Sequence, residues 1–226
     1  MKESDCDNLN YMNKGKFIVI EGGEGSGKSS LINDLKSILA DKENLIFTKE
    51  PGGTSLGEEL KKIILSETHG KIDPSSYLFL FSASRAELLY RVIKPALDSG
   101  KNVICDRFIL STYAYQIHAM GRENLIPILE CINNSMLAGY LPDLNIYLDV
   151  EPSVGIKRIM DDKTRTNLSI FDKASEDFHK KVREGYLKYV NIVSEKDKSL
   201  IIETTNLTTK EVLDKVVTVL KDLGIK

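Results

Sequence analysis

A glycine-rich segment that directly follows a short apolar run constrains this chain more than any other feature. Residues 22–29 read Gly-Gly-Glu-Gly-Ser-Gly-Lys-Ser, and residues 17–20 before them are Phe-Ile-Val-Ile. The segment matches G-x-x-x-x-G-K-[ST] in its required context, with a strand ahead and a helix behind. Glycines at 22, 25 and 27 allow a tight loop whose N–H groups form an anion cradle with the next helix. A plain turn is the alternative, but apolar residues continue at helical spacing from Leu31.

The loop predicts how a nucleotide is held. Lys28 would reach the β- and γ-phosphates, and the hydroxyl of Ser29 would ligate Mg²⁺. Asp106 follows the apolar run 103–105 and is the second predicted Mg²⁺ ligand, with a helix N-cap or an ion pair with Arg107 left open as alternatives. The residues predicted to bind the nucleotide are Gly22, Gly23, Glu24, Gly25, Ser26, Gly27, Lys28, Ser29 and Ser30.

Length and composition suit one α/β domain. The 226 residues are 42% hydrophobic and 28% charged, and the formal net charge of -2 gives no electrostatic signature of nucleic-acid binding. Cys6, Cys105 and Cys131 are too widely spaced for a disulfide framework or a zinc site, so a reducing, cytoplasmic setting is expected. No apolar stretch approaches the roughly 20 residues of a membrane span. Residues 1–14 are polar and are expected to be a flexible tail rather than a signal peptide.

Short apolar runs alternate with helical patterns along the rest of the chain. Strands are expected at 16–21, 45–48, 102–105, 144–150 and 199–202. Helices are expected at 28–41, 56–66, from Pro74 to about 93, 110–119, 123–138, 153–160, 173–194 and 208–222, and Pro95 is expected to kink the long helix or end it early. The alternation predicts an α/β fold in which helices cover both faces of a five-stranded parallel sheet.

Charged residues and glycines gather where the predicted strands end. These positions hold Glu21, Glu50-Pro51-Gly52-Gly53, Asp106-Arg107 and Asp149. In open α/β sheets ligands bind beyond the carboxyl ends of the strands, so these residues are expected to share one site. Arg85, one turn after Phe81, offers a planar guanidinium that suits a phosphate or the edge of a base. A surface arginine and a core phenylalanine are the alternatives for this pair.

The chain resembles the bacterial thymidylate kinase family. The E-P-G-G-T loop at 50–54 and the D-R-F-x-x-S-T-x-A-Y-Q block at 106–116 are the most specific motifs, and the similarity runs from about residue 16 to 220. Further matching segments are the phosphate loop, 80–87 (Leu-Phe-Ser-Ala-Ser-Arg-Ala-Glu), 141–144 and 147–150. The resemblance implies the three-layer fold of P-loop nucleoside monophosphate kinases, in a single domain over 15–226 with a short lid at about 161–172.

The resemblance also implies that ATP phosphorylates dTMP with Mg²⁺, in a homodimer packed through helices. Phe81 would stack on thymine, Arg85 and Gln116 would hydrogen-bond the base, Arg107 would hold the acceptor phosphate, and Tyr115 would favour deoxyribose. The implied substrate-binding residues are Glu50, Pro51, Phe81, Arg85, Arg107, Ser111, Thr112, Tyr115 and Gln116, and the implied catalytic residues are Lys28, Asp106, Arg107 and Arg165.

Two segments depart from the family's pattern. Relatives with an acidic residue at the position of Glu24 place catalytic arginines in the lid, where this chain has Arg165 but Ile170 in place of a further arginine. Arg165 is therefore expected to do most of the catalytic work of the lid, and a solvated loop is the alternative. Asp172 replaces the usual lid glutamate, and residues 117–119 are Ile-His-Ala where relatives usually carry glycines.

Two further functions stay open at this point. One is a P-loop kinase that acts on another nucleotide or a small metabolite, and the other is a non-enzymatic ATP-binding regulator. Phe81 and Arg85 favour the thymidylate acceptor, and the intact Lys28 and Asp106 argue against the regulator. A nucleotide monophosphate is largely dianionic near neutral pH because its second pKa is about 6, so no general base is expected. The three histidines, His69, His118 and His179, receive no role.

Overall fold

The computed structural model describes residues 14–39, 43–66, 68, 72–163, 168–194 and 198–225. Nearly all of the expected tail, residues 1–13, lies outside these ranges, and so do residues 164–167 of the expected lid, including Arg165. His69 is outside them as well. No helix in the described ranges is long and apolar enough to cross a membrane.

A parallel sheet of five strands forms the centre of the described structure. The strands are β1 (Phe17–Gly22), β2 (Leu45–Lys49), β3 (Asn102–Asp106), β4 (Leu144–Asp149) and β5 (Lys198–Glu203). Their order is β2-β3-β1-β4-β5, and every neighbouring pair is parallel. Each predicted strand agrees with these bounds to within one residue at either end. Because β1 lies between β3 and β4, the chain winds outward in both directions from it, and ligands of such sheets bind beyond the carboxyl ends at that point.

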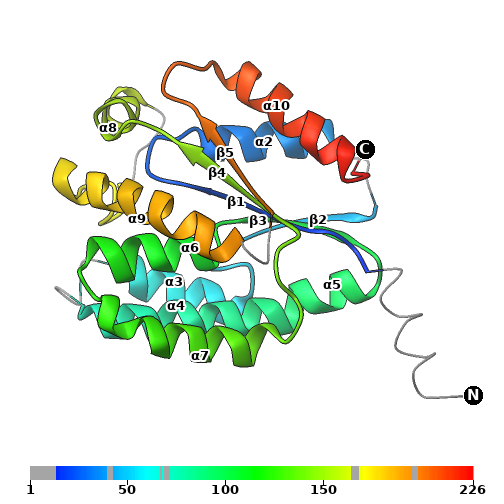
Figure 1. Cartoon of the computed structure of the whole chain (residues 1–226), viewed down its shortest axis with the longest axis horizontal. Coiled ribbons are helices and arrows are strands. Elements are labelled where there is room, and N and C mark those ends of the chain that lie inside the picture. Colours follow the sequence, from blue (N-terminus) through cyan, green and yellow to red (C-terminus); the bar gives the residue numbers. More distant parts are fainter. Residues whose placement is uncertain are drawn as a thin grey trace, which may run out of the picture.

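Helices cover both faces of the sheet (Figure 1). The α-helices are α2 (Lys28–Ile38), α3 (Ser55–Leu65), α4 (Pro74–Leu88), α5 (Lys94–Asp98), α6 (Ile109–Thr112), α7 (Ile126–Leu137), α8 (Pro152–Asp161), α9 (Glu176–Ser194) and α10 (Thr209–Asp222). Two π-helical turns, η1 (Leu89–Ile93) and η2 (Tyr113–Ala119), and a 3-10 turn, η3 (Glu123–Leu125), complete them. Helices α2 and α10 pack on one face of the sheet, and α4, α7 and α9 pack on the other. The predicted three-layer α/β fold is confirmed.

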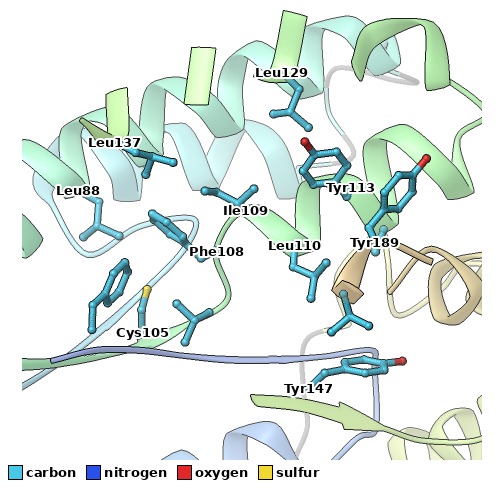
Figure 2. Packing of buried hydrophobic residues seen from close by; sticks show 14 of the residues in the cluster. Leu88, Cys105, Phe108, Ile109, Leu110, Tyr113, Leu129, Leu137, Tyr147 and Tyr189 are labelled. Atoms are coloured by element: carbon cyan, nitrogen blue, oxygen red, sulfur yellow. The ribbon is translucent and has the colours of Figure 1, made fainter. Parts of the chain in front are cut away.

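Successive residues of β1 enter different cores because both faces of the sheet are apolar. Phe17 and Val19 pack among residues of α4, α7 and α9, whereas Ile18 and Ile20 pack among residues of α2 and α10. Figure 2 shows the first of these clusters. In it, Phe17 and Phe108 meet edge to face, with ring centroids 5.1 Å apart. Burial on both faces holds the carboxyl end of β1, and this end is where the phosphate loop starts.

Side-chain caps define where three helices begin. The carboxylate of Asp73 accepts the N–H of Ser75 at 2.8 Å, and α4 then opens with a proline. The hydroxyl of Thr54 accepts the N–H of Gly57 at the start of α3. Thr208 and Glu211 form a reciprocal capping box ahead of α10. Each cap satisfies backbone donors that have no partner inside the helix, which is why these elements begin where they do.

Two helical segments differ from their predicted form. The long helix that begins at Pro74 does not end early at Pro95: after the η1 turn it continues as α5 to Asp98, with Pro95 in the first turn of α5, where the missing N–H costs little. The predicted helix 110–119 is α-helical only in α6, and its remainder is the π-helical η2. Helix α9 approaches η2 so closely that a Cβ on Gly185 would lie 2.8 Å from the Cα of Ala114.

Candidate active site

The phosphate loop joins β1 to α2. Gly25 and Gly27 have φ angles of 70° and 88°, in the left-handed region that favours glycine. Gly25 also lies so close to α8 that a Cβ would be 2.1 Å from the carbonyl oxygen of Gly155. The loop therefore accepts only glycine at Gly25 without movement of α8. Helix α2 starts at Lys28, so its free N–H groups face the space that the loop encloses.

A cavity of about 480 Å³ opens over this loop and is called here the P-loop pocket. Eight of the nine residues predicted to bind the nucleotide line it, all except Gly22. The wall opposite the loop comes from α8 and from the segment that joins β5 to α10, and its residues are Arg158, Ile159, Asp162, Thr204, Leu207, Thr208, Thr209 and Val212. Sequence reasoning did not assign this wall, because no local motif marks it.

Lys28 faces the end of β3. Its Nζ lies 2.5 Å from Oδ1 of Asp106, and its side chain is 9% exposed. Burial lowers the pKa of Lys28, as does the nearby Arg107, while the carboxylate of Asp106 acts in the opposite direction. Asp106 caps no helix, since Phe108 is the N-cap residue of α6, and its ionic partner is Lys28 rather than Arg107. Neither alternative reading of Asp106 therefore matches the structure.

The residues predicted to hold Mg²⁺ fit that ion. Within the described ranges no group of three or more His, Cys, Asp or Glu residues could hold a metal ion. Protein ligation would then come from the carboxylate of Asp106 and the hydroxyl of Ser29, next to the ion pair of Asp106 with Lys28. Mg²⁺ usually keeps several waters and binds through one or two carboxylates and the phosphates of a substrate, so a small oxygen donor set of this kind suits it.

Arg107 lies between the P-loop pocket and a second cavity. It follows β3 with a φ of 69°, an unusual conformation for a residue with a side chain. Its guanidinium donates to Oε1 of Glu24 at 3.2 Å and to the hydroxyl of Tyr186 at 2.9 Å, and it lies 5.2 Å from the ring centroid of Tyr115. These contacts therefore hold a cation at the boundary of the two cavities, where its charge can act on a ligand in either one.

The side chain of Glu24 joins this boundary. The hydroxyl of Tyr115 donates to both carboxylate oxygens, at 2.7 and 2.6 Å, and Arg107 donates from another side. The Nδ1 atom of His179 lies 3.5 Å from Oε2. Burial acts to raise the pKa of Glu24, but contacts with His179, Arg107 and Tyr115 outweigh it and lower the pKa to about 2. Glu24 is thus a carboxylate that links the phosphate loop, the end of β3, η2 and α9.

The second cavity, of about 320 Å³, lies on the other side of Arg107 and is called here the second pocket. All nine residues predicted to bind the substrate line it, although they come from three separate segments of the chain. They are Glu50, Pro51, Phe81, Arg85, Arg107, Ser111, Thr112, Tyr115 and Gln116. Glu24, Lys28 and Arg107 line both pockets. The predicted residues thus meet at the carboxyl ends of β2 and β3, whereas Asp149, at the end of β4, lines neither pocket and pairs with Arg183.

Arg85 is the largest fully buried side chain of the described structure, at 1% exposure. Its Nε lies 2.9 Å from Oε1 of Glu50, and its Nη2 donates to the hydroxyl of Thr112 at 2.7 Å. Burial raises the pKa of Glu50 to about 7, although the guanidinium of Arg85 acts in the opposite direction. The pair joins the loop after β2 to α4 and α6, and both residues line the second pocket.

Gln116 and Phe81 supply contrasting surfaces to the second pocket. Gln116 is buried at 2% exposure, and among the described residues its Nε2 has no hydrogen-bond partner. A buried amide donor without a partner is costly, so this atom is suited to a ligand acceptor in the pocket. Phe81 is half-buried and lines the pocket, with its ring centroid 6.5 Å from that of Tyr77.

Three further residues belong to the site: Glu21, which was expected there without a specific role, and Tyr186 and His179, which the sequence did not place there. Glu21 is fully buried and accepts the N–H of Phe108 at 2.8 Å and the hydroxyl of Ser111 at 2.6 Å, and burial raises its pKa. The hydroxyl of Tyr186 contacts Arg107 and Glu21, and His179 faces Glu24. His179 and Tyr186 lie seven residues apart on α9, so they share one helical face. In the sequence, this seven-residue spacing within a predicted helix was the one feature that could have indicated that His179 and Tyr186 face the same side.

Helix α8 and the described part of the lid that follows it line the two pockets. Arg158 donates to the carbonyl oxygens of Gly25 at 3.2 Å and of Thr204 at 2.9 Å, so it ties α8 to the phosphate loop and to the end of β5. Asp172, which stands where relatives carry glutamate, is buried and lines the second pocket. The position of Arg165 lies outside the described residues, so its expected role stays a prediction.

The two pockets define the class of protein. A phosphate loop of this type binds the donor of a phosphoryl group, and a second pocket that shares a lysine and an arginine with it suits an acceptor that is itself anionic. The chain is a phosphotransferase of the P-loop class.

Comparison with known proteins gives the family. A family model described as thymidylate kinase matches residues 20–216. A thymidylate kinase of Clostridium novyi (strain NT) is 43% identical over 178 residues, which cover 78% of this chain and 85% of that protein. One of Geobacillus sp. (strain WCH70) is 39% identical over 193 residues, covering 85% and 90%. A crystal structure of thymidylate kinase from Ehrlichia chaffeensis matches with a TM-score of 0.71 at 28% identity, covering 92% of this chain and 99% of that one. The chain belongs to the thymidylate kinase family.

Proposed function

We propose that the chain transfers the γ-phosphoryl group of ATP to dTMP, which yields ADP and dTDP on the route to dTTP. A phosphate oxygen of dTMP forms the new bond to the γ-phosphorus, and the bond from that phosphorus to the bridging oxygen of ADP breaks. The observation that carries the proposal is the location of Arg107 and Lys28, which line both pockets and can therefore act on both phosphates at once.

ATP occupies the P-loop pocket in this proposal. The N–H groups of residues 23–27 and the start of α2 surround its phosphates, and Lys28 neutralises part of their charge. The ammonium of Lys28 has three donors, so it can donate to the phosphates from its position beside Asp106. Ser29 and Asp106 would hold Mg²⁺, which would offset phosphate charge in the P-loop pocket.

The acceptor dTMP occupies the second pocket. Phe81 stacks on the thymine ring, while Arg85 and the unpartnered amide of Gln116 hydrogen-bond its edge. Tyr115 lies beside the sugar and disfavours a 2′-hydroxyl. Glu50, Pro51, Ser111 and Thr112 complete the walls.

Catalysis needs charge and alignment rather than a general base. The attacking phosphate is already largely dianionic because its second pKa is about 6. The barrier comes from bringing two anions together, and Arg107 and Lys28 lower it by supplying fixed positive charge at the point of transfer. Arg165 adds charge from the lid, where Ile170 removes the further arginine that relatives carry.

The assembly and setting proposed for the chain follow its family. We assign residues 15–226 to a single kinase domain that acts in the cytoplasm without a nucleic-acid or membrane partner. A homodimer packed through helices is supported by large apolar side chains exposed on α4 and η1. Phe79 is 55% exposed and Tyr90 is 69% exposed. Gel filtration with light scattering tests the dimer.

A panel of monophosphates tests the acceptor. Purified protein with MgATP is given dTMP, dUMP, dCMP, dGMP and UMP in turn, and ADP release is measured by a coupled assay. The proposal expects dTMP to give the highest kcat/KM and UMP to be poor because of Tyr115. The alternative, a P-loop kinase of another nucleotide or of a small metabolite, is supported instead if another acceptor is clearly preferred.

A further inference from the structure

Phe171, in the described part of the lid, lies at the centre of an aromatic cluster. Its ring centroid lies 5.5 Å from that of Tyr115 in an edge-to-face contact, 6.1 Å from that of Tyr77 and 6.4 Å from that of Phe178. Phe171 also lines the second pocket. The lid therefore meets α4, η2 and α9 through aromatic rings at the wall of that pocket.

A closed turn holds the backbone that carries Phe171. The N–H and the hydroxyl of Ser169 both donate to Oδ2 of Asp172, at 2.8 and 2.7 Å, and the N–H of Asp172 donates back to the hydroxyl oxygen of Ser169 at 3.2 Å. The N–H of Ala174 donates to the carbonyl oxygen of Phe171 at 3.1 Å. The backbone that carries the ring is thus held by its own hydrogen bonds, which lowers the entropic cost of using the ring for recognition.

The second pocket has polar and apolar walls. Arg107 and Gln116 supply charge and hydrogen bonds, and Phe81, Pro51 and Phe171 supply apolar surface. A nucleoside monophosphate matches this division, because its phosphate and base edges are polar while the faces of its base and sugar are not.

We propose that Phe171 is a specificity-determining residue that forms the lid side of the second pocket and contacts the nucleoside of the acceptor. The proposal rests on the function proposed above and names a further residue of that same site. It gives the described lid segment a role toward the acceptor, in addition to the role toward ATP expected for Arg165. A different reading is that Phe171 only supports Tyr115 by packing against it.

Phe178 separates the two readings because it is a matched control. It is half-buried like Phe171, and its ring lies 6.2 Å from that of Tyr115, close to the 5.5 Å of Phe171. Phe178 is not among the residues that line the second pocket. Removal of either ring weakens the packing around Tyr115, but only removal of Phe171 takes surface from the pocket.

The test measures dTMP binding by isothermal titration calorimetry, without ATP, for the full chain and for Phe171→Ala, Phe171→Leu and Phe178→Ala. Steady-state KM values for dTMP and ATP and thermal melts are measured on the same samples. We expect Phe171→Ala to weaken dTMP binding about tenfold and to leave the KM for ATP within twofold, as loss of one aromatic contact suggests. We expect Phe171→Leu to recover most of the affinity, and Phe178→Ala to stay within about twofold of the unmodified chain.

Two results would overturn the role of Phe171 while the proposed function stands. The first is that Phe171→Ala binds dTMP as tightly as the unmodified chain does. The second is that Phe171→Ala and Phe178→Ala lose the same amount of dTMP affinity. Failure of the unmodified chain to bind dTMP would instead contradict the proposed function, and with it this inference. If Phe171→Ala has a lower melting temperature, Phe171→Leu still tests the role of the side chain, because leucine keeps most of the apolar volume.

Discussion

The ammonium of Lys28 and the carboxylate of Asp106 form an ion pair with a separation of 2.5 Å. The pair joins the first residue of α2 to the last residue of β3, at the centre of the sheet's carboxyl edge. Lys28 therefore lies beside both pockets. Its ionic partner, Asp106, is the residue that we propose as a ligand of Mg²⁺. The pair thus links the P-loop pocket to the proposed Mg²⁺ ligand.

Replacement of Lys28 by methionine is expected to reduce kcat by about 10² to 10³, the usual loss when a charge aimed at the transition state is removed. The fold should survive, since the carboxylate of Asp106 keeps 25% exposure and can be solvated. ADP release with saturating dTMP measures the loss. Lys36→Met is the control, because Lys36 is an exposed lysine on the same helix. Equal activity of the two variants would exclude the role given to Lys28.

Glu24→Gln is expected to change how stability depends on pH. The pKa of Glu24 is lowered from 4.5 to about 2 in the folded chain, so its carboxylate stabilises the fold above pH 4.5, and this contribution is lost as the pH falls toward 2. The difference of 2.5 units corresponds to a contribution on the order of 3 kcal/mol. Urea unfolding of both proteins from pH 7 to pH 3 measures it.

The unfolding free energies of wild type and Glu24→Gln should therefore differ most near pH 7 and converge toward pH 3. Other buried carboxyl groups, such as Glu21, titrate alike in both proteins and cancel from the difference. A gap between the two proteins that does not change with pH would show that Glu24 is not an ionised carboxylate held by its neighbours.

The effects of substituting Arg85 and Glu50 on the free energy of unfolding are expected to be coupled rather than additive. Arg85→Met leaves the buried carboxyl of Glu50 without its cation, which is expected to cost about 3 to 5 kcal/mol. The raised pKa of Glu50, about 7, means that this carboxyl favours folding less as the pH rises from 4.5 through 7, so the loss is largest at pH 8.

A double-mutant cycle at pH 8 checks the coupling of this pair. The double variant Arg85→Met with Glu50→Gln should be more stable than Arg85→Met alone, because it removes the unpaired charge. Urea unfolding of the unmodified chain, the two single variants and the double variant supplies the four values. Additive losses in the free energy of unfolding would contradict a coupled pair. The control is Lys62→Met, which breaks an exposed ion pair with Glu59 and should lower the free energy of unfolding by less than about 1 kcal/mol.

Arg165→Ala is expected to lower kcat by about 10² while the KM for dTMP changes little, because its charge acts on the transferred group rather than on the acceptor. Lys163→Ala removes a charge two residues earlier in the lid and is the matched control. Turnover within a few-fold of the unmodified chain for Arg165→Ala would favour the reading of the lid as a solvated loop.

Local patterns in the sequence predicted most of the fold and the position of the phosphate loop. Apolar runs such as residues 17–20 and the glycines around Lys28 depend on neighbours in the chain, so they could be interpreted without the structure. The π-helical form of residues 113–119 could not, since one widened turn leaves the apolar spacing close to that of an α-helix.

Contacts between distant segments were beyond local patterns. The side chain of Glu24 was assigned to the nucleotide because of its place in the phosphate loop, yet its carboxylate binds Tyr115 and Arg107 and faces His179, more than 80 residues away in the sequence. The surroundings of Glu24 are set by how α9 packs on η2, a contact that Gly185 permits. No spacing in the sequence encodes that approach.

Transfer of the terminal phosphoryl label from γ-³²P-labelled ATP tests the central claim most directly. The protein is incubated with labelled MgATP, with and without dTMP, and the products are separated by chromatography. We predict that label appears in dTDP in one-to-one ratio with ADP, and that ADP forms far more slowly without dTMP. Label released as inorganic phosphate at the same rate with and without dTMP would contradict direct transfer between the two pockets.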